Sequence, residues 1–342
     1  MSQNQLDGVS ESKDFSISEE KFKNLKSGYA YKKSKTETVI SALVTIGPPL
    51  AFVAAIYLQA IGWYRITGFE ITLALIFHFI GIAGVEIGFH RLFSHNSFVP
   101  VRGVKIAFAI MGSMGFQGPL IWWAAMHRRH HRFTDQKNDP HSPYFKSNGE
   151  SFEGKGIGKR IVGFFHAHMN WVWQSESIQF DVWKTYVKDL YRDKDLFFIH
   201  VTYLYWLALG LILPGFVGMV YYGSLKGFLI GTLWGGLVRI FFSNHLSYWF
   251  INSVSHTFGS RQFETNDKST NSLPLLLALP TLGQNYHNNH HAFPFSGKMS
   301  YRRYEFDVGY ALLWILKFCR LVKAIKRPSQ DQVAKKRSNI NS

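Results

Sequence analysis

Histidine is the residue type most able to do chemistry in this chain, which has 15 histidines beside a single cysteine, Cys319. Eight of these histidines fall into three short motifs. The motif HRLFSH contains two of them and two HxxHH motifs contain six, which together are His90, His95, His127, His130, His131, His287, His290 and His291. On a helix, positions i, i+3 and i+4 share one face, so each HxxHH motif can direct three imidazoles at one point. This spacing is typical of metal binding.

The number of imidazoles predicts two metal ions, because a tetrahedral zinc site uses only four ligands. Imidazole binds iron, copper, nickel and zinc alike, so the ligands do not name the metal. One cysteine excludes a disulfide framework, a CxxC zinc ribbon and a cysteine-ligated iron–sulfur cluster. The sequence has no HExxH motif, which argues against a membrane zinc protease.

The elements that position these motifs are predicted to be membrane-spanning helices. The 342 residues are 46% hydrophobic and 16% aromatic, and long uncharged runs alternate with loops rich in Lys, Arg and His. A helix of about 20 apolar residues crosses the hydrocarbon core of a bilayer. We predict an all-α integral membrane protein with a helical cap that carries the histidines and with four spans, at about 39–63, 70–90, 197–220 and 228–250. Pro48 and Pro49 should kink the first span.

The uncharged run from Ile106 to Met126 is long enough to span but separates the first two histidine motifs. A membrane crossing would place those motifs about 30 Å apart, and one metal site could not use both. We therefore predict an interfacial or re-entrant segment at 106–124, interrupted by several glycines and Pro119. The run 273–282 is too short to span and contains Pro274 and Pro280.

Four spans place both termini and all histidine motifs on one side. Lysines crowd the segment before the first span, whereas the opposite side offers Arg65 and Lys226, so the positive-inside rule predicts that the histidine side is cytoplasmic. The net charge of +16 in so apolar a chain favours lipid head groups or anionic substrates over nucleic acid. We expect a polar, basic tail at 1–36, a membrane domain at 37–327 and a mobile polar tail at 328–342.

In order and spacing, HRLFSH, HRRHH and HNNHH resemble the three histidine boxes of the membrane fatty-acid desaturase family, and are most similar to its acyl-CoA Δ9 branch. The resemblance extends from about Thr38 to Arg327 and includes NSVSHTFG at 252–259. It implies two irons bound by nine histidines, with Asn252 reaching a metal through water. The implied ligands are His90, His95, His127, His130, His131, His256, His287, His290 and His291.

Other polar and aromatic residues receive supporting roles. Asn252 and His256 are four residues apart, so they face the same way at the end of the fourth span. Glu86 lies one turn before His90 and could orient that ligand. Further candidates for hydrogen bonds to ligands are Asp135, Asp139, His141 and His168. Candidates for lining a substrate channel are Trp123, Trp171, His245 and Trp249, whereas His166 is expected at the surface and His78 and His200 in helix packing.

The resemblance implies an O2-dependent desaturase that inserts a cis double bond, of Δ9 type, into a long acyl chain. A lipid hydroxylase on the same scaffold would share the histidines, and their spacing does not separate the two reactions. A histidine-rich metal transporter, a different class, should place ligands within the spans along a pathway. The sequence has no GxGxxG, flavin or fused haem motif, so we expect a separate electron donor such as cytochrome b5, a ferredoxin or a rubredoxin.

The sequence does not specify the group that carries the acyl chain. In the acyl-CoA branch, basic residues contact the CoA group, and the comparable positions here are Ala125, Ser175 and Glu176. Those residues lack the cationic donors that bind phosphate. A loop at 142–162 contains Lys146, Lys155, Lys159 and Arg160, which could replace them. An acyl-CoA, an acyl carrier protein and a lipid-bound chain are therefore all candidate substrates.

Overall fold

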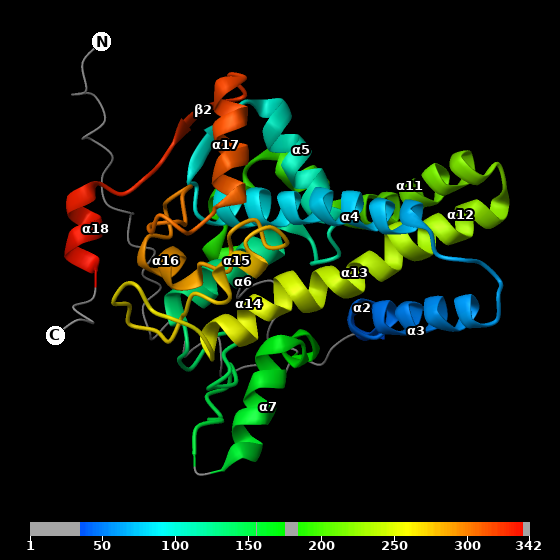
Figure 1. Cartoon of the computed structure of the whole chain (residues 1–342). Coiled ribbons are helices and arrows are strands. Elements are labelled where there is room, and N and C mark those ends of the chain that lie inside the picture. The colour runs from blue at the N-terminus through cyan, green and yellow to red at the C-terminus, as the bar shows by residue number, and fades with distance from the viewer. Residues whose placement is uncertain (1–34, 155, 175–183, 338–342) are drawn as a thin grey trace.

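The computed structural model describes residues 35–154, 156–174 and 184–337. Most of the predicted N-terminal tail, together with Lys155, Ser175 and Glu176, lies outside the described residues. The described chain is helical apart from one small antiparallel sheet, formed by β1 (Phe98–Pro100) and β2 (Val322–Ile325). Long helices extend to one end of the molecule, and shorter helices and loops gather at the other end, which we call the cap (Figure 1).

The first predicted span is broken into α2 (Lys35–Thr45) and α3 (Gly47–Ala60), which meet at an angle of 40°. Pro48 and Pro49 lie in the first turn of α3, where a missing N–H costs no helical hydrogen bond. In the interior of one straight helix, each proline would instead remove a backbone hydrogen bond. The kink predicted from the two prolines is therefore confirmed.

Three further helices are long and apolar enough to cross a membrane, and the bent pair would make four. The first joins α4 (Gly68–Ile82) to the π-helix η2 (Ala83–Ser94), and the second is α11 (Tyr203–Tyr222). The third runs through α12 (Leu225–Gly231), η6 (Thr232–Val238), α13 (Arg239–Ser243), η7 (Asn244–Tyr248), α14 (Trp249–Ser253) and η8 (Val254–His256). Two of these helices continue beyond the predicted spans and carry His90 and His256 into the cap.

The run Ile106–Met126 folds as two helices rather than one. Helix α5 (Arg102–Ser113) ends before a turn in which Phe116 and Gly118 have φ of 65° and 94°, and α6 (Leu120–Phe133) follows. Gly112 of α5 contacts Gly84 of η2 so closely that a Cβ on Gly84 would lie 2.0 Å from the Gly112 nitrogen. The run is therefore not one straight helix, and the turn returns the chain to the histidines.

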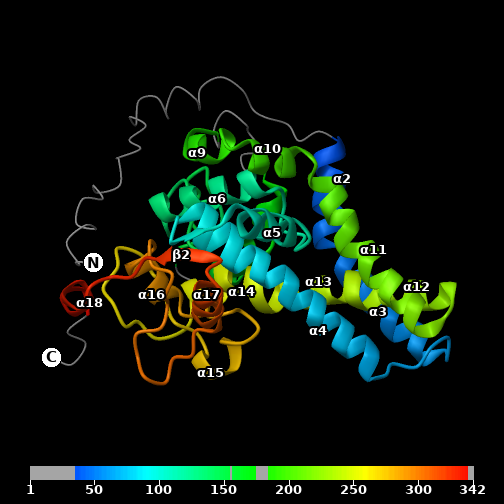
Figure 2. The same ribbon diagram turned by 90° about the horizontal axis from the view of Figure 1, so that it is seen from above.

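The remaining helices of the cap are short. They are α7 (Ile157–His168), η3 (Asn170–Trp173), η5 (Lys184–Tyr186), α9 (Lys188–Tyr191), α10 (Lys194–Val201), α15 (Pro274–Leu277), α16 (His287–Ala292), α17 (Val308–Phe318) and α18 (Gln330–Lys336). Figure 2 shows α16 and α18 at the end of the molecule opposite α3 and α12. Helix α15 has only four residues, so the prediction that 273–282 does not span is also confirmed.

The C-terminal segment corrects one prediction. Ser329 caps α18 and forms a capping box with Gln332. The Lys336 ammonium donates to the Ala292 carbonyl at 2.9 Å, and the Glu264 amide donates to the Lys336 carbonyl at 3.2 Å. The expectation of a mobile tail from 328 is wrong for Ser329–Arg337, because backbone pairing anchors a polar segment that has no apolar pattern to reveal it.

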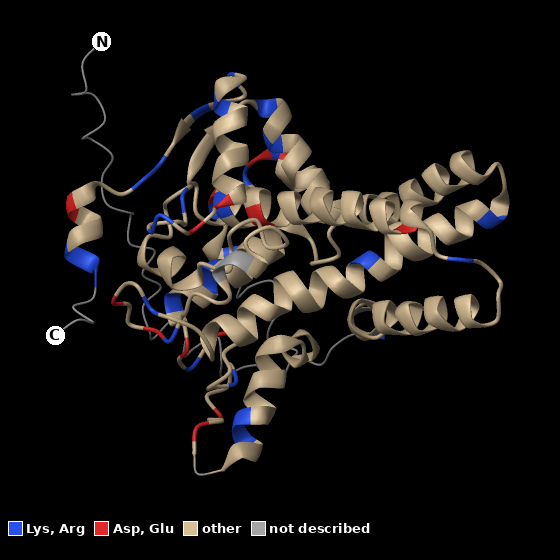
Figure 3. Cartoon of the chain, in the orientation of Figure 1, with Lys and Arg blue, Asp and Glu red and all other residues tan. Residues whose placement is uncertain are grey.

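Charged residues gather in the cap and are sparse along the long helices (Figure 3). Glu86 and Arg239 lie within the predicted spans 70–90 and 228–250 and are buried inside the protein, as expected for ions that would be costly in lipid. His166 differs from its prediction. It is 1% exposed and its ring packs 5.1 Å from that of Phe152, because α7 turns this side chain toward the 142–152 loop.

Candidate metal centre

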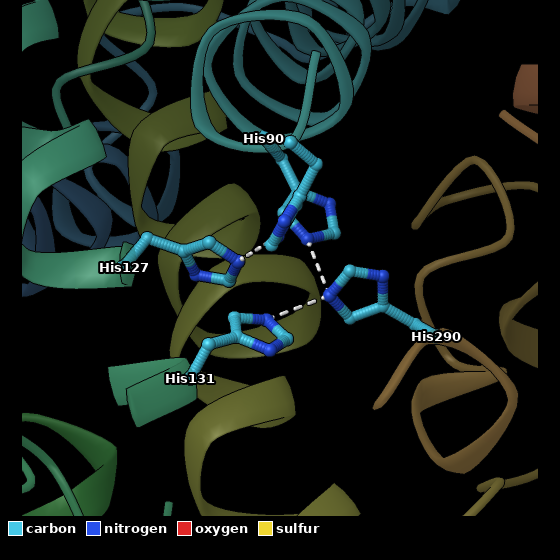
Figure 4. Close-up of side chains that lie close together, drawn as sticks. His90, His127, His131 and His290 are labelled. Carbon is cyan, nitrogen blue, oxygen red and sulfur yellow. Dashed lines mark hydrogen bonds between the residues drawn. The ribbon is translucent and has the colours of Figure 1, made fainter. Parts of the chain in front are cut away.

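The structure gathers all nine predicted ligand histidines into two adjacent groups. Within each group the candidate ligand nitrogens lie within 4.8 Å of one another. The first group is His90, His95, His127, His131 and His290, and the second is His130, His256, His287 and His291. Figure 4 shows four imidazoles of the first group converging from different parts of the chain.

Helices α6 and α16 each supply ligands to both groups. His127 and His131 of α6 join the first group, and His130 joins the second. In α16 the i, i+4 pair His287 and His291 joins the second group, and His290 joins the first. The expectation that each HxxHH motif directs all three imidazoles at one point is therefore wrong. Position i+3 lies on the other side of position i from i+4 around a helix, so one turn can serve two sites.

The Nε2 atoms point inward in both groups. In the first, Nε2–Nε2 distances are 2.8 Å for His95–His127, 3.0 Å for His90–His290 and 2.8 Å for His131–His290. In the second, His287 Nε2 lies 2.9 Å from His256 Nε2 and 3.0 Å from His291 Nε2. Each group thus surrounds a small volume with imidazole nitrogen.

Carboxylates accept hydrogen bonds from the outer Nδ1 atoms of four ligands. Glu86 lies 2.8 Å from His90 Nδ1, Asp139 3.0 Å from His130 Nδ1 and Asp135 3.0 Å from His256 Nδ1. Each bond fixes the tautomer with the proton on Nδ1 and the lone pair on Nε2. Three carboxylates predicted from sequence therefore lie where they can orient ligands.

The fourth carboxylate, Asp267, was missed by the sequence analysis. Its Oδ2 lies 2.9 Å from His291 Nδ1, and its Oδ1 accepts from the Ser269 amide at 2.9 Å. Burial raises the pKa of Asp267, but His291 and the Ser269 hydrogen bonds outweigh burial and lower it below its ordinary value. A loop delivers this residue, so no helical spacing from a histidine could indicate it.

The arrangement of protons in the second group fits a bound cation. His256 and His291 each donate through Nδ1, so both Nε2 atoms carry lone pairs, and both face the single Nε2 of His287. His287 Nε2 can donate at most one proton, so at least one of the two nitrogens that face it has no hydrogen bond. His130 Nε2 is also buried without a hydrogen-bond partner among the described residues. A cation among these nitrogens would satisfy all of them.

Burial also keeps six of the candidate ligands in the neutral form that a metal needs. Desolvation, followed by repulsion from neighbouring imidazoles, holds the pKa of these six well below its ordinary value, namely His95, His127, His130, His131, His287 and His290. His256 differs, because the adjacent Asp135 raises its pKa although the ring is buried. Metal binding requires deprotonated imidazole. The donor set, all nitrogen, suits a transition metal rather than Mg²⁺ or Ca²⁺.

A cavity opens beside the histidines, and its wall includes His127, His130 and His287. Asn252 and the predicted channel residues Trp123 and Trp171 line it as well. His141 also lines it and stacks on His130 with ring centroids 4.3 Å apart. The cavity therefore joins the metal-binding groups to aromatic walls, which suits an apolar substrate.

Three predicted residues lie together elsewhere. His168 Nε2 is 2.9 Å from His245 Nδ1, His168 Nδ1 is 2.9 Å from Ser253 Oγ, and the ring of Trp249 packs beside both histidines. Among the described residues, neither His245 nor Trp249 lines the cavity, whereas Tyr248 does. The π-helix η7 has more residues per turn than an α-helix, so the face predicted from a period of 3.6 is displaced.

The sequence matches a known protein family over most of its length. Residues 39–306 match the family described as "Fatty acid desaturase". The chain belongs to the fatty acid desaturase family. This desaturase is 36% identical to a hex-5-enoyl-[acyl-carrier protein] acetylenase of Moorena producens (strain JHB), over 86% of this chain and 88% of that protein.

Two further relatives of the desaturase are named for lipid substrates. It is 33% identical to an sn-1 stearoyl-lipid 9-desaturase of Synechocystis sp., over 77% of this chain and 73% of the relative. It is 30% identical to delta-9 acyl-lipid desaturase 1 of Arabidopsis thaliana, over 79% of each chain. The chain is thus an oxidoreductase of fatty-acid metabolism with apolar helices and histidine clusters able to bind metal.

Proposed function

We propose that this desaturase binds two irons and uses O2 to insert a double bond into a fatty-acyl chain. The observation that carries the proposal is the pair of inward-facing imidazole groups beside an aromatic cavity. One iron would be held by the first group and the other by the second, with Asn252 reaching a metal through water. When bound, the irons would supply the redox chemistry that reduces O2 to water and removes two hydrogens from adjacent carbons.

The protein itself orients the ligands and shapes the space for the chain. Glu86, Asp135, Asp139 and Asp267 hold four imidazoles with Nε2 inward. Trp123 and Trp171 offer flat apolar surfaces on which an alkyl chain can pack. An unactivated methylene has no acidic proton, so no side chain is needed as a general base. A metal transporter is disfavoured because the ligands cluster at one end of the long helices.

The iron content and the product test this proposal. Protein purified after expression with iron should contain close to two irons per chain, and mass spectrometry of the acyl products should show the loss of two hydrogens. Hydroxylation on the same scaffold would instead add one oxygen. A content near one metal per chain, or full activity with zinc alone, would contradict the two-iron proposal.

Reconstituted turnover with purified components identifies the acyl carrier and the electron donor. The names of the relatives above include an acyl carrier protein and a lipid, and the histidine motifs resemble the acyl-CoA branch. The same acyl chain is therefore offered on each of these three carriers. We propose that a small redox protein of the cytochrome b5, ferredoxin or rubredoxin type delivers electrons. The donor that supports turnover with purified desaturase identifies the partner.

We propose that four spans bring both termini and the cap to the cytoplasmic side, with the membrane domain at 37–327. The family match over 39–306 and the apolar helices support this organisation. Reporters inserted after Asn96 and after Thr134 should both be cytoplasmic, because α5 and α6 reverse at the turn between them. Reporters on opposite sides would show that 106–126 crosses the membrane.

Removal of the Asp267 carboxylate should weaken metal binding. Loss of a hydrogen-bond partner behind a ligand costs about 10–100-fold in metal affinity, so Asp267→Ala should lose iron to a chelator sooner than the unmodified protein. Asp331→Ala is the matched control, because Asp331 lies exposed on α18. Equal iron retention by both variants would show that Asp267 does not support His291.

A further inference from the structure

The cavity lies beside the histidines. Its wall comes from α6, η3, the η7–α14 segment, α16 and nearby loops, and it includes Gln117 and Tyr248. Among the described residues, no wall residue belongs to α4 or α11, the long helices on either side of the region below. The space for a substrate therefore stays beside the metal-binding groups and does not extend between the long helices.

The side chain of Tyr248 fills the place where the cavity would otherwise continue. Tyr248 is 6% exposed, and its hydroxyl would lie 3.6 Å from a Cβ on Gly81 and 3.4 Å from a Cβ on Gly115. Both positions are glycines, so the phenol occupies room that side chains of α4 and of the α5–α6 turn leave free. The aromatic ring thus forms the floor of the cavity.

Arg239 closes the region behind Tyr248. Its Nη1 would lie 3.0 Å from the same Cβ position at Gly81, which places the two side chains next to each other. Its Nη2 donates to the Met114 carbonyl at 2.9 Å and its Nε to the Gly235 carbonyl at 2.9 Å. A buried guanidinium bound to carbonyls of separate helices is costly to move. The guanidinium of Arg239 therefore lies next to the Tyr248 side chain and is held in place by these hydrogen bonds.

We infer that Tyr248 limits the length of the acyl chain and that the substrates are short acyl chains whose methyl end stops beside the two histidine groups. This inference rests on the proposed function. A Δ9 bond in a stearoyl chain leaves half of the chain beyond the double bond, and the closed floor offers no room for it. The hex-5-enoyl chain in the name of the Moorena relative belongs to this short class.

The test compares chain length across four forms of the full-length protein. Hexanoyl, dodecanoyl and octadecanoyl pantetheine thioesters are offered to the unmodified protein and to Tyr248→Ala, Tyr248→Phe and Tyr205→Ala. Tyr205 is a matched control, because it lies exposed on α11. Because the phenyl ring of phenylalanine fills the same floor, Tyr248→Phe should keep the length preference, as should Tyr205→Ala.

Opening the floor should change the preference by a measurable factor. The unmodified protein should favour hexanoyl over octadecanoyl, and Tyr248→Ala should raise the dodecanoyl to hexanoyl ratio of kcat/KM by at least about tenfold, the scale on which pockets discriminate added methylenes. Tyr248→Leu serves if the alanine variant does not fold. An octadecanoyl preference in the unmodified protein, or an unchanged ratio in a folded, iron-containing variant, would overturn the inference.

Binding without turnover separates this inference from the proposed function. Each thioester that binds should raise the unfolding temperature of the purified protein, and the order of the shifts reports the preferred length. Iron-loaded protein that desaturates none of the thioesters, on pantetheine or on the three carriers, would contradict the proposed function. The order of the thermal shifts would still support or overturn the role of Tyr248.

Discussion

Replacing His287 by alanine is expected to abolish desaturation and to release iron from the second group. His287 Nε2 lies 2.9 Å from His256 Nε2 and 3.0 Å from His291 Nε2, so it contacts two of the three other imidazoles of this group. A methyl group cannot coordinate a metal, and the partly vacated group would keep three imidazoles. Metal analysis of purified protein and the fatty-acid profile of expressing cells measure the two effects.

Two variants define the specificity of this result. His200→Ala changes a histidine of α10 outside both groups and should retain iron and activity. Asn252→Ala should retain iron and lose about 10–100-fold in activity, as expected for a residue that acts through one hydrogen bond. Retention of both irons and normal turnover by His287→Ala would show that the metals are not held by this group.

Replacing Arg91 by methionine is expected to destabilise the protein severely. Arg91 is 1% exposed, its Nε donates to Glu86 at 3.1 Å and its Nη2 donates to Asp307 at 3.0 Å. The substitution leaves two buried carboxylates without their cation, and breaking such a network costs about 3–5 kcal/mol of unfolding free energy. The midpoint of thermal unfolding, or the yield of folded protein, measures the loss.

A surface ion pair provides the comparison for Arg91. The Arg102 side chain is 76% exposed and forms a bidentate pair with Asp195. Water screens the charges of an exposed pair, so Arg102→Met should shift the unfolding midpoint only slightly. Similar losses in both variants would show that burial of the Arg91 network does not determine its contribution. Because Glu86 also accepts from His90, Arg91→Met should disturb the first histidine group as well.

Local spacing explains which parts of the site could be predicted. Eight of the nine histidines were found because they lie in three short motifs, and His256 was found from the resemblance of NSVSHTFG to a desaturase segment. Glu86 was found because it lies four residues before His90. Asp267 lies 24 residues before its partner His291 and is brought there by a loop. The division of each HxxHH motif between two groups depends on how α6 and α16 face each other, which the sequence of one helix does not specify.

Helix register limits what the sequence predicts along the long helix Leu225–His256. The eleven residues from His245 to His256 make about three turns at a period of 3.6, which favours one shared face, but the π-helix η7 between them shifts the register of that face. Tyr248 lies on the cavity instead. The long apolar helices were predicted at nearly the right positions, because apolar length is a property of the sequence alone and does not depend on register.

The sharing of α6 and α16 between the two histidine groups has a thermodynamic consequence. A metal bound to the first group would fix both helices in orientation and so reduce the conformational entropy that the second group must lose on binding. Occupancy of one group would then raise the metal affinity of the other, and by linkage the effect would be reciprocal. We therefore expect metal titration to pass between empty and fully loaded forms with little of the singly loaded species.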